Sequence, residues 1–170
     1  MKTIEGKLTV SGYRFAIVLS RFNEFIGKRL LDGALKCFSK YNFSNDNIDL
    51  ILVPGAFELP VTAQKIAESK KYNAVICLGA VIRGGTPHFE YVAGNTAEGI
   101  LEVSLKCKVP IIFGVLTTDT YEQALERSAF SQEQLSENDN PEGIKEKGSG
   151  NKGWDAALTA IEMADLFTKI

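Results

Sequence analysis

Apolar runs and amphipathic stretches alternate along the chain. Four short runs are rich in β-branched and other apolar residues and lack the strict polar alternation of a strand with one solvated face. They lie at residues 13–20, 48–55, 72–82 and 110–117. Strands of this composition are typical of a parallel sheet buried on both faces. The pattern therefore predicts four parallel strands.

Segments with helical periodicity follow these runs. The first carries apolar side chains at helical spacing from Phe25 to Phe38, and Ser20 and Asn23 before it are candidate N-caps. The next has Pro60 in its first turn, where proline is tolerated. The predicted helices after the second, third and fourth strands and at the chain end span residues 57–69, 89–108, 119–130 and 153–170. Repeated strand–helix units predict a doubly wound α/β sandwich.

Length and composition fit one domain, residues 1–170. The chain is 45% hydrophobic and 24% charged with a net charge of −2, so it lacks the positive charge that a nucleic-acid partner requires. Its apolar stretches are too short to cross a bilayer, and its first residues do not resemble a secretion signal. We therefore expect a cytoplasmic protein with no membrane partner. Cys37, Cys77 and Cys107 are interpreted as buried free thiols rather than metal ligands or disulfides.

Functional groups are expected in the loops that follow the strands, because doubly wound folds bind ligands at the carboxyl ends of their strands. In a parallel sheet, all four loops lie along one edge; they cover residues 20–25, 54–60, 82–89 and 116–127. Phe22 and Phe57 are aromatic residues in the first two loops and together suit a planar ring, although each alone more often packs in a core. Glu58 adds a carboxylate, which has the alternative role of a charge at a helix start.

The third loop has the composition of an anion site. Gly84, Gly85 and Thr86 offer backbone N–H groups and a hydroxyl at the start of a predicted helix, and Arg127 can reach this region from the fourth unit. Two stretches of the sequence resemble nucleotide-binding motifs, but each lacks a required feature. The loop has Gly85 where a P-loop needs lysine, and the G-x-G-x-x-G at residues 148–153 follows no strand. Neither ATP nor NAD is predicted.

His88 is the only histidine of the chain and ends this loop. Imidazole groups exchange protons near neutral pH, so a histidine beside an anion site can act as a general acid or base. A lone histidine at a helix start more often has no chemical role. The neighbouring aromatic, acidic and glycine residues favour the functional interpretation.

Five segments resemble the lumazine synthase family and occur in the same order. They are SRFNEFIGKRLLDGAL, VPGAFELP, LGAVIRGGTPHFEYVA, FGVLTTDTYEQALER and GNKGWDAALTAIEMA, and the resemblance covers residues 8–127 and 150–167. It implies a flavodoxin-like α/β fold, a three-layer sandwich around a four-stranded parallel sheet. It also implies a cofactor-free and metal-free enzyme of riboflavin synthesis. Such enzymes join 5-amino-6-(D-ribitylamino)uracil to 3,4-dihydroxy-2-butanone 4-phosphate and release 6,7-dimethyl-8-ribityllumazine, phosphate and water.

The resemblance also implies roles for individual residues. His88 matches the proton-transfer group, and Phe22 matches the aromatic that stacks on the pyrimidine. The residues that match the remainder of the substrate-binding slot are Ala56, Phe57, Glu58, Val81 and Ile82, with Phe113 contributed by a neighbouring subunit. The residues that match the phosphate site are Gly85, Thr86, Arg127 and Lys152. Two alternatives stay open: a lumazine or flavin carrier without activity, and an enzyme that dismutates lumazine to riboflavin.

The resemblance implies a homopentamer with active sites between subunits, and residues 1–12 are expected to pair with a neighbour's sheet edge. The polar segment 128–150 is longer than the family's usual connection, so we expect an inserted loop, a helix extended from Arg127 toward Leu135, and a shifted Lys152. Some family members assemble pentamers into 60-subunit shells. Burying this insertion at such a contact is costly, which favours an isolated pentamer, whereas an insertion pointing outward leaves the shell intact.

Overall fold

The computed structural model describes residues 1–8, 12–130 and 150–170. Its centre is a four-stranded parallel sheet with the order β2-β1-β3-β4. The strands are β1 (Phe15–Ser20), β2 (Ile48–Val53), β3 (Ala74–Ile82) and β4 (Ile111–Thr118). The four predicted parallel strands are therefore confirmed, with ends that lie within two residues of the prediction.

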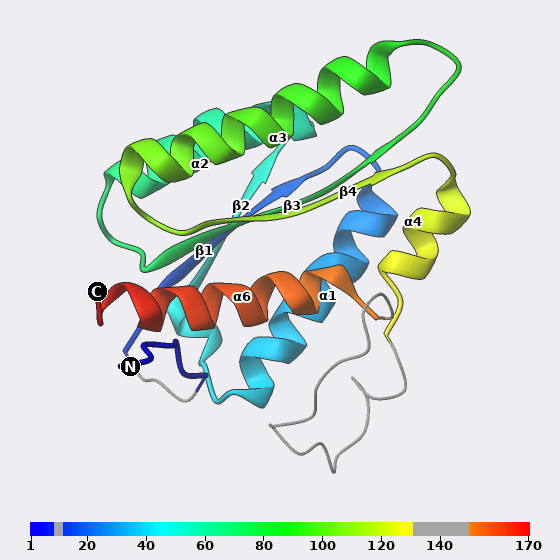
Figure 1. The fold of residues 1–170 in the computed structure, drawn as a ribbon. Helices are drawn as coiled ribbons and strands as arrows, with labels where there is room; N and C mark the ends of the chain where they lie inside the picture. Colours follow the sequence, from blue (N-terminus) through cyan, green and yellow to red (C-terminus); the bar gives the residue numbers. More distant parts are fainter. Residues whose placement is uncertain (9–11, 131–149) are drawn as a thin grey trace.

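Helices cover both faces of the sheet, as predicted, and form a three-layer α/β sandwich. One face carries α2 (Leu59–Glu68) and α3 (His88–Cys107); the other carries α1 (Glu24–Lys40), α4 (Tyr121–Arg127) and α6 (Lys152–Phe167) (Figure 1). The short 3₁₀ turns η1 (Asn45–Asn47) and η2 (Ala56–Glu58) precede β2 and α2. Within the described residues, no helix is both long and apolar enough to cross a membrane.

The core has one layer on each side of the sheet, because successive side chains of a strand point to opposite faces. In β1, Phe15 and Ile17 pack toward α1 and α6, whereas Ala16 and Val18 pack toward α2 and α3. The ring centroid of Phe15 lies 4.8 Å from that of Phe38. Both faces of β1 are buried, which explains why its sequence is apolar without alternation.

The edge strands are less covered than predicted. Leu50 and Leu52 of β2 are 47% and 56% exposed, and Phe113 of β4 is 44% exposed. The expectation that every strand is buried on both faces is therefore wrong for β2 and β4. Each outer strand has a neighbouring strand on one side only, and the helices contact β1, β3 and β4 more than β2, so some side chains on the outer strands have fewer neighbours within the chain.

The N-terminal segment docks on α6 of its own chain. The backbone N–H of Lys7 donates to Asp165 Oδ2 over 2.6 Å, and Lys169 forms an ion pair with the same oxygen. The hydrogen bond from Lys169 is the main cause that lowers the pKa of Asp165. Residues 9–11 lie outside the described residues, and the expected pairing of residues 1–12 with a neighbouring subunit stays a prediction.

Two helix ends differ from the sequence expectations. Asn23 occupies the N-cap of α1 in a left-handed conformation (φ 59°), and its side chain caps nothing there. Helix α4 ends at Arg127, and residues 128–130 are not helical, so the expected continuous extension toward Leu135 is wrong. The rest of that extension, and most of the proposed insertion, falls on residues 131–149, which lie outside the described residues.

None of the three cysteines forms a disulfide. Cys37 and Cys77 are buried, as predicted, whereas Cys107 is only partly buried. Burial raises the pKa of the Cys77 thiol to about 12. This thiol is accordingly protonated and inert at neutral pH.

Candidate active site

The carboxyl ends of β1, β2 and β3 bring three of the predicted loops together. The parallel hydrogen bonding of β1 and β2 continues beyond the strands, because Arg21 N donates to Val53 O over 2.8 Å and Phe22 N donates to Pro54 O over 3.1 Å. The Asn23 side chain then donates to the Ala80 carbonyl of β3 over 2.9 Å. These bonds fix the aromatic side chain of the first loop beside the second and third loops.

A pocket of about 630 Å³ opens where these loops meet. Eight of the predicted site residues line it: Phe22, Ala56, Phe57, Glu58, Val81, Ile82, Thr86 and His88. The volume suits a small molecule. The pocket lies between β1 and β3, where the strand order reverses, which is the usual ligand position in doubly wound folds.

Phe22 and Phe57 are surface residues of this pocket. Their side chains are 71% and 57% exposed, so the alternative that they pack in the core is wrong. Val81 beside them is buried in the sheet and provides an apolar floor. The arrangement can accept a flat ring by apolar contact and stacking.

Glu58 has a local role as well as a place in the pocket. Its Oε2 accepts the backbone N–H of Gly55 over 2.9 Å and closes the η2 turn. In the part of the chain that the structure describes, no hydrogen bond reaches its Oε1. The carboxylate is therefore held in a defined position with one oxygen able to accept a ligand hydroxyl.

His88 is the first residue of α3 and is exposed in the pocket wall. The N–H groups in the first turn of a helix favour an anion nearby. Gly84 and Gly85 precede this turn, and a Cβ atom at either position would meet nothing within 4 Å. Gly84 and Thr86 line the pocket, and Gly85 lies between them in sequence without lining it.

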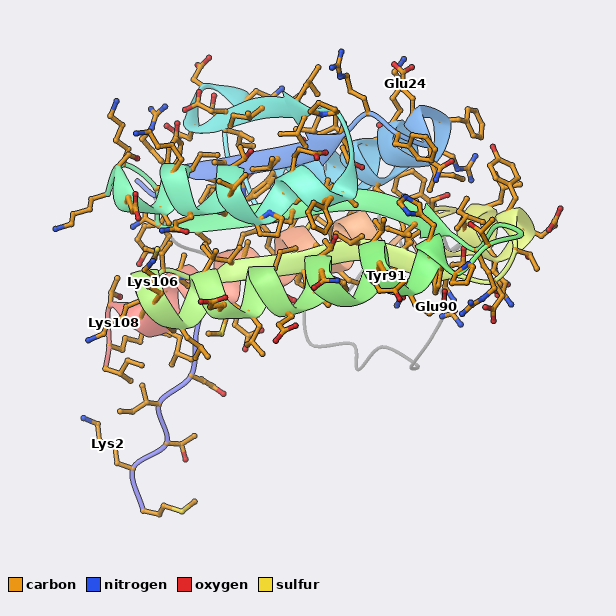
Figure 2. The ribbon with its side chains drawn as sticks, turned by 90° about the horizontal axis from the view of Figure 1, so that it is seen from above. Lys2, Glu24, Glu90, Tyr91, Lys106 and Lys108 are labelled. Carbon is orange, nitrogen blue, oxygen red and sulfur yellow. The ribbon has the colours of Figure 1, made fainter. Side chains whose placement is uncertain are left out.

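The pocket also contains residues that the sequence pattern does not predict as site residues. Asn23 has the position of a helix cap, and the pattern predicts Phe89, Tyr91 and Val92 only as part of a helix. Tyr91 and Val92 lie three and four positions after His88, so helical spacing from the histidine could have identified them. Figure 2 shows Glu90 and Tyr91 at one end of α3, the end that borders the pocket, and Lys106 and Lys108 at the other end of the helix.

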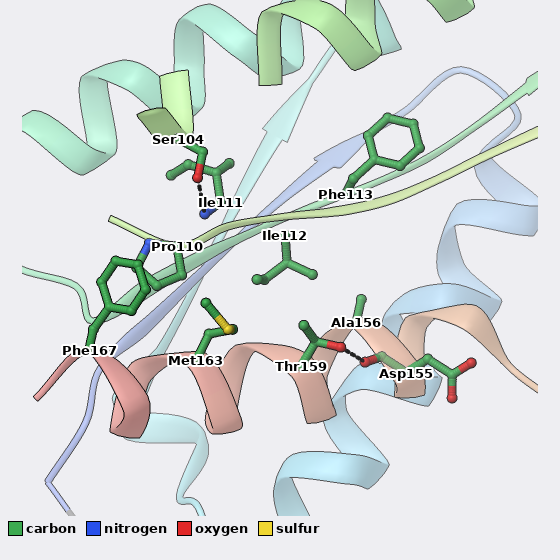
Figure 3. A pocket seen from close by; sticks show the side chains of 10 residues that line it. All are labelled: Ser104, Pro110, Ile111, Ile112, Phe113, Asp155, Ala156, Thr159, Met163 and Phe167. Atoms are coloured by element: carbon green, nitrogen blue, oxygen red, sulfur yellow. Dashed lines mark hydrogen bonds between the residues drawn. The ribbon is translucent and has the colours of Figure 1, made fainter. Parts of the chain in front are cut away.

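Three predicted site residues lie away from the pocket. Phe113 borders a groove of about 450 Å³ between β4, α3 and α6, where its ring points to the side of β4 opposite to Ile112 (Figure 3). Lys152 begins α6, and its Nζ lies 2.9 Å from Oδ2 of Asp155, a residue of the same groove. Arg127 ends α4. The single chain therefore does not gather these three side chains around His88.

Among the described residues, no group of three or more His, Cys, Asp or Glu side chains is arranged to hold a metal ion. The chemistry that the pocket itself offers is apolar binding of a ring, hydrogen bonding by a carboxylate and a hydroxyl, and proton transfer by imidazole.

Comparisons with known proteins show what the whole chain is similar to. The sequence model of the family described as 6,7-dimethyl-8-ribityllumazine synthase matches residues 12–168. Two relatives, both named 6,7-dimethyl-8-ribityllumazine synthase and both from Clostridium kluyveri, are each 51% identical over 170 residues. The alignment covers 100% of this chain and 99% of each relative.

Proposed function

The chain belongs to the 6,7-dimethyl-8-ribityllumazine synthase family, and we propose that the pocket around Phe22, Glu58 and His88 is its active site. The protein is a transferase of riboflavin biosynthesis that forms 6,7-dimethyl-8-ribityllumazine. One observation supports this location most strongly: three separate loops bring an aromatic ring, a carboxylate and the only histidine to one pocket of suitable size.

The pocket offers a position for each part of 5-amino-6-(D-ribitylamino)uracil. Phe22 stacks on the pyrimidine, and Val81 and Ile82 line the slot beneath it. Ala56, Phe57 and Glu58 hold the ribityl chain, whose hydroxyls donate to the carboxylate of Glu58. The exposed Phe22 ring and the fixed Glu58 carboxylate support these roles.

The second substrate, 3,4-dihydroxy-2-butanone 4-phosphate, places its phosphate at the Gly85–Thr86 loop and the start of α3. A helix N-terminus and open glycine N–H groups suit a phosphate. Arg127 adds a guanidinium that can bind phosphate through two hydrogen bonds, and Lys152 adds an ammonium group.

The reaction needs repeated proton transfer. The substrate amine attacks the ketone to form an imine with loss of water, phosphate leaves as an enol develops, and the ribitylamino nitrogen closes the second ring with loss of a second water. His88 moves protons between these intermediates. Holding both substrates in the pocket contributes more, because orientation can lower a barrier by about 7–11 kcal/mol.

The active form is a homopentamer in the cytoplasm, with each site between two subunits. Phe113 is exposed on an edge strand, and Lys152 and Arg127 lie outside the pocket of their own chain. A neighbouring subunit that presents this surface to the pocket supplies the aromatic ring and the cations that the single chain does not bring together.

An assay with both substrates tests the function. The purified protein is mixed with the ribitylaminouracil and the butanone phosphate, and lumazine is followed by its absorbance. The proposed function predicts lumazine only when both substrates are present. A carrier would bind added lumazine without forming it, and an enzyme that dismutates lumazine would produce riboflavin from lumazine alone.

A further inference from the structure

Arg83 follows β3 and contacts three groups at once. Its Nε lies 2.7 Å from Asp119 Oδ1, its Nη1 is paired with Glu90 Oε1, and its guanidinium carbon lies 4.2 Å from the centroid of the Phe89 ring. Its backbone N–H also donates to Thr118 O over 2.9 Å. The side chain does not line the pocket.

These contacts meet at the first turn of α3. Phe89 and Glu90 directly follow His88, so the guanidinium holds both residues that come after the proposed proton-transfer group. Asp119 is itself fixed, because its backbone N–H donates to the Gln123 side chain over 2.8 Å in the capping box of α4. Arg83 therefore ties the turn that carries His88 to the connection between β4 and α4.

The contacts require an arginine. A planar guanidinium can donate in two directions and stack on a ring at the same time, whereas an ammonium group is a single point of charge. The hydrogen bond from Arg83 is the main cause that lowers the pKa of Glu90, and the hydrogen bond to Asp119 is the main cause that raises the pKa of Arg83. With two carboxylates already paired to it, the guanidinium is poorly suited to bind a substrate phosphate.

The three contacts contribute little to overall stability, since the Arg83 side chain is 42% exposed and exposed ion pairs are weak. Their effect on geometry is larger, because misplacing a reacting group by about 1 Å can slow a reaction about 10²-fold. We propose that Arg83 is a positioning residue that acts through His88 by fixing the first turn of α3. This inference rests on the proposed role of His88 as the proton-transfer group.

The matched control is Arg14. Its Nη2 lies 3.2 Å from Asp49 Oδ2 with similar exposure, 46% for each side chain, at the amino end of the sheet. We expect Arg83→Met to lower kcat about 10-fold and to leave the KM of both substrates within about 2-fold, because no residue that lines the pocket is substituted. Arg14→Met should retain the kcat of the wild type. Both variants should melt at similar temperatures when followed by the fluorescence of Trp154, the only tryptophan. Arg83→Lys should recover part of the lost kcat.

The decisive measurement combines substitutions. If Arg83 acts through His88, Arg83→Met lowers kcat in the wild type but has no further effect in His88→Ala. An equal fold loss of kcat in both backgrounds overturns the inference, and so does a selective rise in KM for the butanone phosphate with an unchanged kcat, which would indicate a direct phosphate contact. A kcat of Arg83→Met equal to that of Arg14→Met also overturns it. If His88→Ala alone retains the wild-type kcat, the proposed role of His88 fails together with the inference.

A second readout does not depend on activity. His88 gives the only histidine side-chain signals in a nuclear magnetic resonance spectrum of the protein. Arg83→Met should shift and broaden these signals, because the first turn of α3 gains freedom, and Arg14→Met should leave them unchanged. Identical His88 signals in the two variants contradict a positioning role.

Discussion

The side chain of Asn151 donates a hydrogen bond to the backbone carbonyl of Ser128 over 2.7 Å, in the buried interior. These two residues flank the long polar segment between α4 and α6. The same amide donates to Arg29 O over 2.8 Å, and its oxygen accepts the N–H groups of Gly153 and Trp154. One buried side chain thus joins the two ends of this polar segment and caps α6. It fixes the backbone beside Arg127 and Lys152 whatever the length of the chain between them.

Asn151→Ala should destabilise the fold strongly. It removes the cap of α6 and the buried donor to the Ser128 carbonyl, so we expect a loss of about 2–4 kcal/mol in the free energy of unfolding. Denaturant titration followed by Trp154 fluorescence measures it. Asn95→Ala is the control, because among the described residues the Asn95 amide bonds only to Tyr91 O on the exposed surface of its own helix. This substitution should cost less than about 0.5 kcal/mol. Equal losses would mean that the buried amide does not join the two segments.

Loss of the His88 side chain should lower kcat, whereas loss of the Arg127 side chain should weaken substrate binding. His88→Ala lowers kcat but retains measurable turnover, since acid–base help is typically worth about 10²–10⁴-fold and water can partly replace it. Arg127→Ala loses most of the affinity for the butanone phosphate. Steady-state kinetics with each substrate varied in turn separates the two effects. Unchanged affinity for the phosphate substrate in Arg127→Ala would remove this residue from the phosphate site.

If each active site lies between two subunits, two impaired variants should restore activity when they form mixed oligomers. His88→Ala and Phe113→Ser are each impaired, but co-expression of the two variants produces mixed oligomers in which some pockets combine an intact His88 with an intact Phe113 from the neighbour. We expect the mixed oligomers to exceed the activity of either variant. Separately purified variants mixed just before the assay are the control. If co-expression yields no gain, the site is contained within one chain.

We expect the protein to assemble into isolated pentamers, each with five times the 18.6 kDa mass of the chain. A bulky polar insertion between residues 128 and 150 would be costly to bury at a contact between pentamers. Sedimentation or light scattering of the purified protein distinguishes a pentamer from a shell of sixty chains. A shell would refute the isolated pentamer, and removal of residues 130–147 should then leave the assembly unchanged.

Cys77 should weaken the fold at alkaline pH. Its pKa in the folded protein is raised to about 12 from an ordinary 9.0 by burial. The unfolded chain therefore releases the proton first, and the stabilisation is complete below pH 9.0 and lost progressively between these two values. Each pH unit in that window costs about 1.4 kcal/mol. Unfolding free energies of the wild type and Cys77→Ala, measured from pH 7 upward, should converge as the pH rises. A constant difference would show that Cys77 does not titrate on unfolding.

The hydrophobic pattern was sufficient to predict the four parallel strands and the helices that cover them. The central strands β1 and β3 are buried on both faces, so their apolar composition identified them directly. The location of the site was predictable as well. Parallel strands place their carboxyl ends at one edge of the sheet, so the loops that follow the strands must lie close together. Phe22, Glu58 and His88 could thus be assigned to one pocket from their positions after three different strands.

The contacts between distant segments could not be predicted from any local pattern and are visible only in the folded structure. The pairing of Arg83 with Asp119, the bond from Asn23 to Ala80 and the two hydrogen bonds that the Asn151 amide donates to Arg29 O and Ser128 O each join segments far apart in the chain. The exposure of Leu52 and Phe113 depends on which strands lie at the sheet edges, and strand order is not visible in the composition of a strand. Hydrophobic periodicity is a local property that indicates helix or strand and which face is buried. The hydrogen-bond partner of a polar side chain depends instead on which groups the folded chain brings within bonding distance.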